Sequence, residues 1–205
     1  MRPVDPRVAV LASGAGSNLQ ALLDDGYIGQ RVALVVSDKP EAGALERARA
    51  RGIRAVALLP SHYGTRPEYD HALATLLEEE AIGYVLLAGF MRILGPPVIR
   101  AFSERILNVH PSLLPAFPGA HAPRDALEWG AKVSGVTIHL VDEEVDHGPI
   151  VLQEAVDVEP GDTEETLHGR IQQVEHRLYP LAARLLVEGR LKVEDRRVHV
   201  LDGEV

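Results

Sequence analysis

An asparagine and a histidine one residue apart are the first pair in this chain whose types and spacing suit catalysis. They are Asn108 and His110, in the stretch Asn-Val-His-Pro-Ser-Leu-Leu-Pro that begins at position 108. A short apolar run that begins at residues 105–107 predicts a buried strand, and alternate side chains of a strand share a face. Asn108 and His110 therefore point the same way, while Val109 points into the packing. Pro111 ends the strand and stiffens the turn after it.

The two side chains suit the stabilisation of an oxyanion. An amide donates hydrogen bonds without changing its charge, and an imidazole donates a proton or, when charged, a stronger hydrogen bond. Aimed at one carbonyl oxygen, the pair would stabilise negative charge as it forms. The plainer alternative is that Asn108 satisfies backbone groups at a strand end and that His110 is a packed core histidine.

A third candidate lies on the acidic loop from Asp142 to Asp146. Asp146 beside His110 would hold the imidazole ring and favour its charged form. Alternatively, the loop is the solvated tip of a hairpin. The sequence alone leaves both interpretations open.

A glycine-rich turn follows the first apolar run, which covers residues 7–12. The turn reads Ser-Gly-Ala-Gly-Ser-Asn from position 13, and leucines at helical spacing follow it up to Gly26. Free backbone N–H groups at the start of a helix favour phosphate. A dinucleotide motif would need glycine where Leu19 stands, and no Gly-Lys-Ser/Thr follows. The turn therefore predicts a phosphate loop, with an ordinary strand-to-helix turn as the alternative, and Asp38 is interpreted as a turn residue.

Strands and helices alternate through the first half of the chain, which predicts an α/β fold with a Rossmann-like, doubly wound, mostly parallel sheet. Residues 133–141 alternate apolar and polar side chains, so we expect an antiparallel C-terminal part with one wetter face. Strands are expected at 7–12, 32–36, 54–58, 84–88, 105–110, 133–141 and 150–153, and helices at 42–51, 66–80, 98–102 and 123–129.

A long C-terminal helix is expected after the capping box at 162–165, with a kink at Pro180 and an end at Gly189. Gln172 and Glu175 lie three residues apart and so share a face, roughly opposite the apolar stripe. Spacing alone makes them surface residues. A small hairpin is expected in the tail.

Composition restricts the function further. At 205 residues the chain is expected to be one domain, 1–205, with halves of about 1–100 and 101–205. It has no cysteine, which excludes thiol nucleophiles and Cys-based zinc sites. A net charge of −9 argues against nucleic-acid binding. No apolar run has membrane-spanning length, and residues 1–6 lack the apolar stretch of a signal peptide, so we expect a cytoplasmic location.

Four motifs in this order resemble those of the glycinamide ribonucleotide formyltransferase (phosphoribosylglycinamide formyltransferase) family. They are Ser-Gly-x-Gly-Ser-Asn-Leu from 13, Leu-Ala-Gly-Phe-Met-Arg-Ile-Leu from 87, Asn-Val-His-Pro-Ser-Leu-Leu-Pro from 108 and Asp-x-Gly-Pro-Ile from 146. The resemblance covers nearly the whole chain. It implies the formyltransferase fold and transfer of a formyl group from 10-formyltetrahydrofolate, a co-substrate, to the amine of glycinamide ribonucleotide in purine biosynthesis.

The resemblance also implies site residues. Catalysis would use Asn108, His110 and Asp146. The ribonucleotide would be held by Gly16, Ser17, Asn18, Gln172 and Glu175. The folate would lie against Arg66, Met91, Arg92, Ile93, Leu94, Asn108 and the backbone of Asp142, Glu143, Glu144, Val145 and Asp146. His121 and His139 would contact the site residues without touching either substrate.

The expected mechanism is direct attack of the amine on the formyl carbon, without a covalent enzyme intermediate or a metal. The chain departs from the family at Ala116, Ala120 and Ala122, where lysine, leucine and threonine are common, so auxiliary contacts from that loop are in doubt. The expected partners are small molecules, with no nucleic acid and no membrane, and the expected state is a monomer or a weak homodimer.

Four rival functions stay open at the level of sequence. A 10-formyltetrahydrofolate hydrolase gives the formyl group to water but carries an extra regulatory domain ahead of its catalytic part. A methionyl-tRNA formyltransferase adds a basic C-terminal domain, for which this acidic chain has no room. A zinc enzyme could use His110, His121, His139 or His147, although their spacing fits no ligand pattern. A non-catalytic nucleotide-binding module would use the phosphate loop alone.

Overall fold

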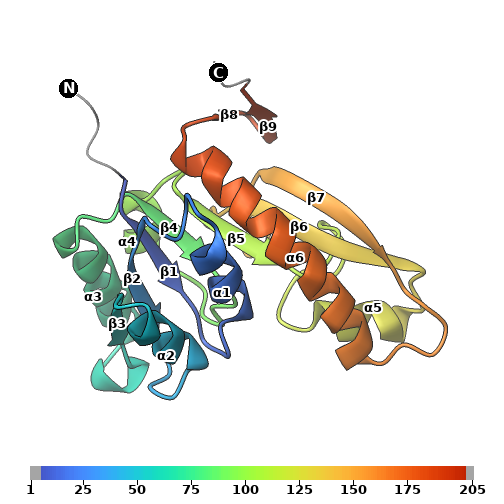
Figure 1. Cartoon of the computed structure of the whole chain (residues 1–205), viewed down its shortest axis with the longest axis horizontal. Coiled ribbons are helices and arrows are strands. Elements are labelled where there is room, and N and C mark those ends of the chain that lie inside the picture. The colour runs from blue at the N-terminus through green and yellow to red at the C-terminus, as the bar shows by residue number, and fades with distance from the viewer. Residues whose placement is uncertain (1–5, 202–205) are drawn as a thin grey trace. The chain divides into compact units, whose positions relative to one another are not determined.

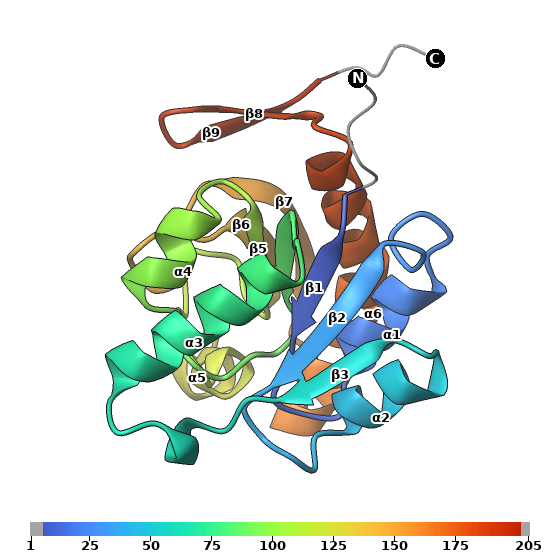
Figure 2. The same ribbon diagram turned by 90° about the vertical axis from the view of Figure 1, so that its left-hand side faces the viewer.

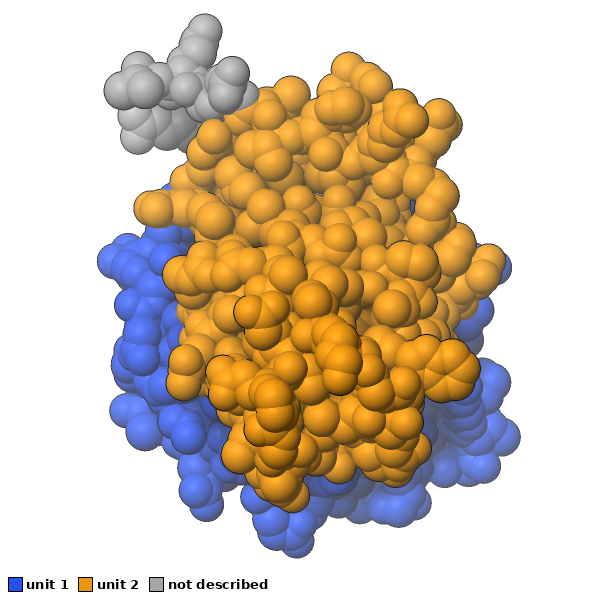
Figure 3. Space-filling model, turned by 90° about the vertical axis from the view of Figure 1, so that its right-hand side faces the viewer, with its two compact units in different colours: residues 1–107 blue, residues 108–205 orange. Residues whose placement is uncertain are grey.

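The computed structural model describes residues 6–201, which form two compact units, residues up to 107 and residues from 108 onward. Figure 3 colours them separately, and each is described by itself. Residues 1–5, on which the expectation of no signal peptide rests, lie outside the described residues.

The first unit is a parallel sheet with strand order β3-β2-β1-β4. In Figure 2, α1 and α2 lie on one side of these strands and α3 on the other. β4 continues to the start of β5 through a hydrogen bond from the Val85 N–H to the Arg105 carbonyl, 2.9 Å. The elements are β1 (Val8–Leu11), α1 (Ser17–Asp24), β2 (Val32–Ser37), α2 (Gly43–Ala50), β3 (Arg54–Ala57), the 3-10 helix η1 (Pro60–His62), α3 (Arg66–Glu79), β4 (Tyr84–Leu87), α4 (Pro96–Ala101) and β5 (Ile106–His110).

The second unit begins with Asn108–His110 of β5 and continues in the order β5-β6-β7-β9-β8. β6 and β7 are antiparallel, as are β8 and β9, whereas β7 and β9 are parallel. The long helix α6 packs against β6, β7 and α5 (Figure 1). The elements are α5 (Ala122–Trp129), β6 (Val133–Leu140), β7 (Ile150–Asp157), α6 (Glu164–Val187), β8 (Leu191–Glu194) and β9 (Arg197–Val200).

The predicted fold class is therefore confirmed: strands and helices alternate, the sheet is mostly parallel, and its C-terminal part is antiparallel. The expected wetter face of residues 133–141 is wrong. Ser134, Thr137 and His139 are as buried as the apolar residues between them. The polarity of Thr137 and His139 reflects internal hydrogen bonds rather than contact with water, because buried polar groups need partners.

The start of α6 also differs from expectation. Its capping box joins Thr163 to Thr166, so the reciprocal bond is made by a hydroxyl and not by a glutamate. The helix then continues through Pro180 to Val187 as one element. Within residues 6–201, no helix is both long and apolar enough for a membrane span.

Candidate functional site

Asn108 is held in place by a buried histidine. Its Nδ2 lies 3.0 Å from Nε2 of His139, and Nδ1 of His139 lies 2.8 Å from the Leu140 carbonyl oxygen. A carbonyl only accepts, so Nδ1 carries the ring proton and Nε2 accepts from the Asn108 amide. Burial lowers the pKa of His139 below 6.5, which favours this neutral form.

His110 is buried, and both of its ring nitrogens face oxygen atoms. Nε2 lies 2.8 Å from the Phe117 carbonyl oxygen and therefore donates to it. Nδ1 lies 3.4 Å from Oδ2 of Asp146. An imidazole that carries protons on both nitrogens would satisfy both acceptors.

Asp146 lies close to residues of β5, of β6 and of the loop that follows β5. Its Oδ2 accepts from the Gly119 N–H at 2.7 Å, and its Oδ1 lies 3.8 Å from Nε2 of His139. The second distance is no ion pair, because burial keeps His139 neutral. Asp146 has a φ of 53°, a conformation that aspartate tolerates better than most side chains. The structure thus groups Asn108, His110 and Asp146.

A buried network that no sequence motif indicates supports the turn after His110. The Thr137 hydroxyl donates to the Ser112 carbonyl at 2.7 Å and accepts from the Leu114 N–H at 3.0 Å. The Gln153 amide donates to the same hydroxyl at 2.8 Å and to the Leu114 carbonyl at 2.9 Å. These bonds fix the start of the loop that carries the Phe117 carbonyl. The proline-rich sequence indicated a rigid loop, but nothing in it pointed to β6 and β7.

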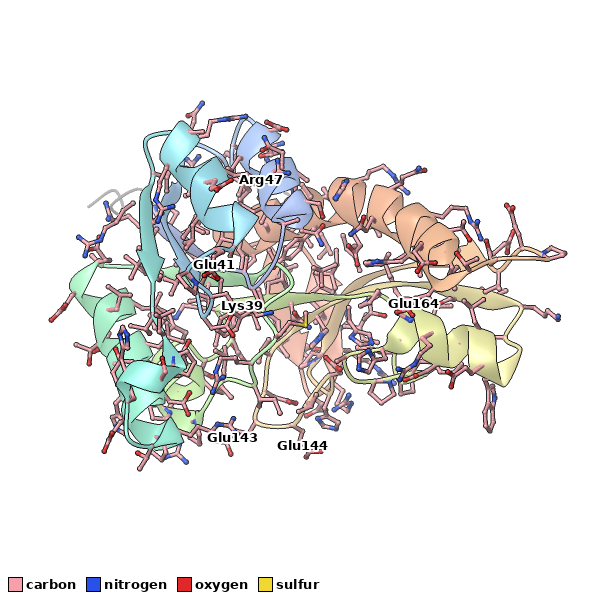
Figure 4. The ribbon with its side chains drawn as sticks, turned by 90° about the horizontal axis from the view of Figure 1, so that it is seen from below. Lys39, Glu41, Arg47, Glu143, Glu144 and Glu164 are labelled. Atoms are coloured by element: carbon pink, nitrogen blue, oxygen red, sulfur yellow. The ribbon has the colours of Figure 1, made fainter. Side chains whose placement is uncertain are left out.

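In the first unit, hydrogen bonds from neighbouring segments hold the glycine-rich loop in place. The Ser13 hydroxyl donates to Oδ1 of Asp38 at 2.6 Å and accepts from the Met91 N–H at 2.8 Å. Asp38 is therefore more than a turn residue, because it ties the loop to β2. Arg47, labelled on α2 in Figure 4, donates to the Ala15 carbonyl at 2.8 Å.

Gly16 sets the conformation of this loop. Its φ is 79°, and a Cβ there would lie 2.8 Å from the Cα of Ala44. Only glycine fits without strain. Ser17 then begins α1, so the backbone N–H groups from Ser17 and buried Asn18 belong to the first turn of a helix. That geometry is the one expected of an anion site.

The segment Met91–Leu94 and Arg66 are brought together. Arg66 donates to the Ile93 carbonyl at 2.9 Å and lies 3.6 Å from Asp70. Met91 and Ile93 are 63% and 54% exposed, so both apolar side chains are open to a flat ligand. Leu94 is only 5% exposed, so any contact with a ligand would come from its backbone.

A tyrosine of α3 supports this segment. The Arg92 guanidinium lies over the Tyr69 ring, 5.0 Å from its centre. Burial raises the pKa of Tyr69 to about 12, so this side chain stays neutral.

On α6, the structure corrects the spacing argument for Gln172 and Glu175. Glu175 is only 3% exposed and Gln172 is half-buried, so neither decorates the surface. Neighbouring elements cover more of the circumference of α6 than its apolar stripe alone predicts, so polar positions such as Glu175 are buried too. A carboxylate is rarely buried without partners. His121, by contrast, lies at the exposed start of α5.

The acidic loop presents its side chains to solvent. Glu143 and Glu144, labelled in Figure 4, and Val145 are exposed. Asp142 instead bonds within the loop, accepting from the Glu144 N–H at 3.0 Å and from His147 at 2.8 Å. Over residues 6–201, the structure holds no group of three or more acidic or histidine side chains arranged for a metal ion.

The fold and the grouped polar residues define an α/β enzyme of the formyl transferase class. The family model described as formyl transferase matches residues 6–183, and the chain belongs to this family.

Relatives and solved structures agree with this assignment. A phosphoribosylglycinamide formyltransferase from Escherichia coli is 43% identical over 200 residues, which cover 96% of this chain and 94% of that protein. The trifunctional purine biosynthetic protein adenosine-3 of Gallus gallus is 45% identical, but the chain spans only 19% of its length. The crystal structure of glycinamide ribonucleotide transformylase 1 from Symbiobacterium toebii is 52% identical, with a TM-score of 0.93 over 96% of this chain and 94% of that one.

Proposed function

We propose that this protein transfers the formyl group of 10-formyltetrahydrofolate to the amine of glycinamide ribonucleotide, a step of de novo purine biosynthesis. The products are formylglycinamide ribonucleotide and tetrahydrofolate. The observation that carries the proposal is the grouping of Asn108, His110 and Asp146, with His110 Nδ1 3.4 Å from Asp146 Oδ2. The names of the E. coli relative and of the S. toebii structure support the same reaction.

In the proposed mechanism, the amine attacks the formyl carbon and an oxyanion develops. One N–H of the Asn108 amide is used by His139, at 3.0 Å, and the second N–H donates to the oxyanion. When the folate binds, the Nε2–H of His110 releases its hydrogen bond to the Phe117 carbonyl and donates to the formyl oxygen instead. Such catalytic hydrogen bonds often form only in the substrate complex.

Proton transfer completes the proposed reaction. The attacking nitrogen loses a proton and the departing N10 of the folate gains one, while the new C–N bond forms and the old one breaks. Asp146 orients His110 and assists this transfer, directly or through water. Holding two substrates in line supplies much of the acceleration.

Binding roles follow the predicted set. Gly16, Ser17 and Asn18 hold the phosphate of the ribonucleotide, which matches the helix start at Ser17. Gln172 and Glu175 contact the ribonucleotide, and the burial of Glu175 supports a role other than solvation. The folate lies against the exposed side chains of Met91 and Ile93 and the loop of residues 142–146, with Arg66 approaching its glutamate end.

The remaining proposals concern organisation and setting. We propose that the chain is one formyltransferase domain, with a phosphate-binding first half and a folate-binding, catalytic second half. It acts in the cytoplasm on small molecules, as a monomer or weak homodimer. Analytical ultracentrifugation at several protein concentrations tests the oligomeric state.

One experiment separates the transferase from its rivals. The purified protein is mixed with 10-formyltetrahydrofolate, and tetrahydrofolate release is followed with and without glycinamide ribonucleotide. The transferase requires the ribonucleotide. Equal rates in both tubes would favour the hydrolase, and no release in either would favour the non-catalytic nucleotide-binding module.

A further inference from the structure

The hairpin of β8 and β9 lies beyond the segment that the formyl transferase model matches, which ends at residue 183. In Figure 1 it follows the C-terminal end of α6. β9 pairs with β7 where Arg197 lies opposite Ile150. The turn of the hairpin contains Asp195 and Arg196, and Asp195 has a φ of 55°.

Arg196 reaches from this turn to the acidic loop between β6 and β7. Its Nη2 donates to the His147 carbonyl oxygen at 2.6 Å, and its Nη1 lies 2.9 Å from Nε2 of the same histidine. A guanidinium only donates, so Nε2 of His147 is the acceptor. Nδ1 of His147 then carries the ring proton and donates to Oδ2 of Asp142 at 2.8 Å.

These contacts close the loop on itself and anchor it. Asp142 begins the acidic loop and His147 follows its last residue, so the bond between them joins the two ends. Arg196 holds the same junction from outside through both the ring and the carbonyl. Because His147 is the residue after Asp146, its carbonyl position constrains the backbone that aims the Asp146 carboxylate at His110.

The other side of the junction is equally constrained. A Cβ at Gly148 would lie 1.8 Å from the Leu140 carbonyl oxygen, so the backbone passes β6 at close range. Asp146 itself has a φ of 53°. Backbone in this region persists only where its surroundings hold it.

Stability alone does not account for the contact. Arg196 is exposed and the His147 side chain is 44% exposed, and exposed polar contacts of this kind add little to folding. What the contact does determine is the position of one loop. No local sequence pattern indicates this contact, because Arg196 lies far along the chain from Asp146.

We propose that Arg196 is a positioning residue for the loop of residues 142–146, holding both its backbone and the Asp146 carboxylate. The C-terminal hairpin thereby becomes part of the catalytic apparatus without touching substrate. The inference rests on the proposed roles of Asp146 and of this loop in folate binding.

The test compares Arg196→Ala with Arg197→Ala, which removes a neighbouring exposed arginine from the same hairpin. Arg196→Ala should lower kcat/KM for 10-formyltetrahydrofolate by about tenfold, the scale of one charge-assisted hydrogen bond. The KM for glycinamide ribonucleotide and the free energy of unfolding should stay unchanged. Arg197→Ala should behave as the wild type in all three measurements.

Arg196→Lys should restore part of the loss, since an ammonium group can donate to the His147 carbonyl but does not form the planar fork. Wild-type kinetics of Arg196→Ala, or an equal rise in both KM values, would overturn the inference. Asp146→Asn is measured alongside: if it keeps full activity, the role of Asp146 fails instead. If Asp146→Asn is inactive while Arg196→Ala is normal, only the hairpin's role fails.

Discussion

The Asn108 amide and the His139 imidazole form a donor–acceptor pair at 3.0 Å in which the histidine is the acceptor. The Leu140 carbonyl fixes the tautomer of His139, so the partner of Asn108 is set by β6. One amide proton is committed to this bond, which determines where the second one points.

The first prediction concerns this pair. His139→Leu should lower kcat by on the order of a hundredfold, the cost of misplacing a catalytic group by about 1 Å. Steady-state kinetics at saturating concentrations of both substrates measure it. In an Asn108→Ala background the same substitution should have little further effect, since it acts through Asn108. Independent, multiplicative losses would contradict this assignment.

The second prediction addresses the two proposed oxyanion donors. Asn108→Ala and His110→Ala should each lower kcat by roughly a hundredfold to a thousandfold, the scale for one lost oxyanion donor. Dissociation constants for glycinamide ribonucleotide, measured by calorimetry, should change little, because the donors act on the formyl oxygen. Retention of wild-type turnover by either variant would exclude that residue from the mechanism.

The third prediction concerns the buried Thr137 network. Thr137→Val keeps the shape of the side chain but leaves the Leu114 N–H and the Ser112 carbonyl without this partner. Unfolding in urea should show a loss of about 2 kcal/mol, the cost of burying unsatisfied polar groups. Thr75→Val, at an exposed position of α3, is the matched control and should change stability by under about 0.5 kcal/mol. Similar losses in both variants would refute the importance of the network.

The sequence predicted most elements because their signals are local. Thr65 and Glu68 form the expected capping box, and Gly130 and Gly189 follow α5 and α6 with positive φ. The proximity of Asp146 to His110 was proposed from chemistry alone. The burial of Glu175 was not predicted, because periodicity gives the face of a helix but not what covers that face.

Partners from distant strands were also missed. Thr137 looked like the wet side of an alternating strand, and its bonds to the Ser112 carbonyl and Leu114 N–H depend on sheet pairing. Arg196 had no motif at all. Side-chain hydrogen bonds between elements follow from tertiary packing, which no local pattern encodes.

The fourth prediction is a pH dependence of stability. Burial lowers the pKa of His139 in the folded state below the ordinary value of 6.5. The unfolded chain therefore binds more protons than the folded one as pH falls below 6.5, and the free energy of unfolding decreases. Urea titrations between about pH 8 and pH 5 measure this slope. His139→Gln, which can still accept from Asn108, should show a shallower slope, and an unchanged slope would contradict the neutral form of His139.

The fifth prediction uses two glycines of the same loop. Gly16→Ala places a methyl group 2.8 Å from the Ala44 Cα at a φ of 79°, whereas a Cβ at Gly14 has nothing within 4 Å. Gly16→Ala should lower the free energy of unfolding by about 1–3 kcal/mol, the cost of such strain, and Gly14→Ala should not. Since the first turn of α1 moves with Gly16, the KM for glycinamide ribonucleotide should rise more than that for 10-formyltetrahydrofolate. Equal changes in the two KM values would mean that this loop does not hold the ribonucleotide phosphate.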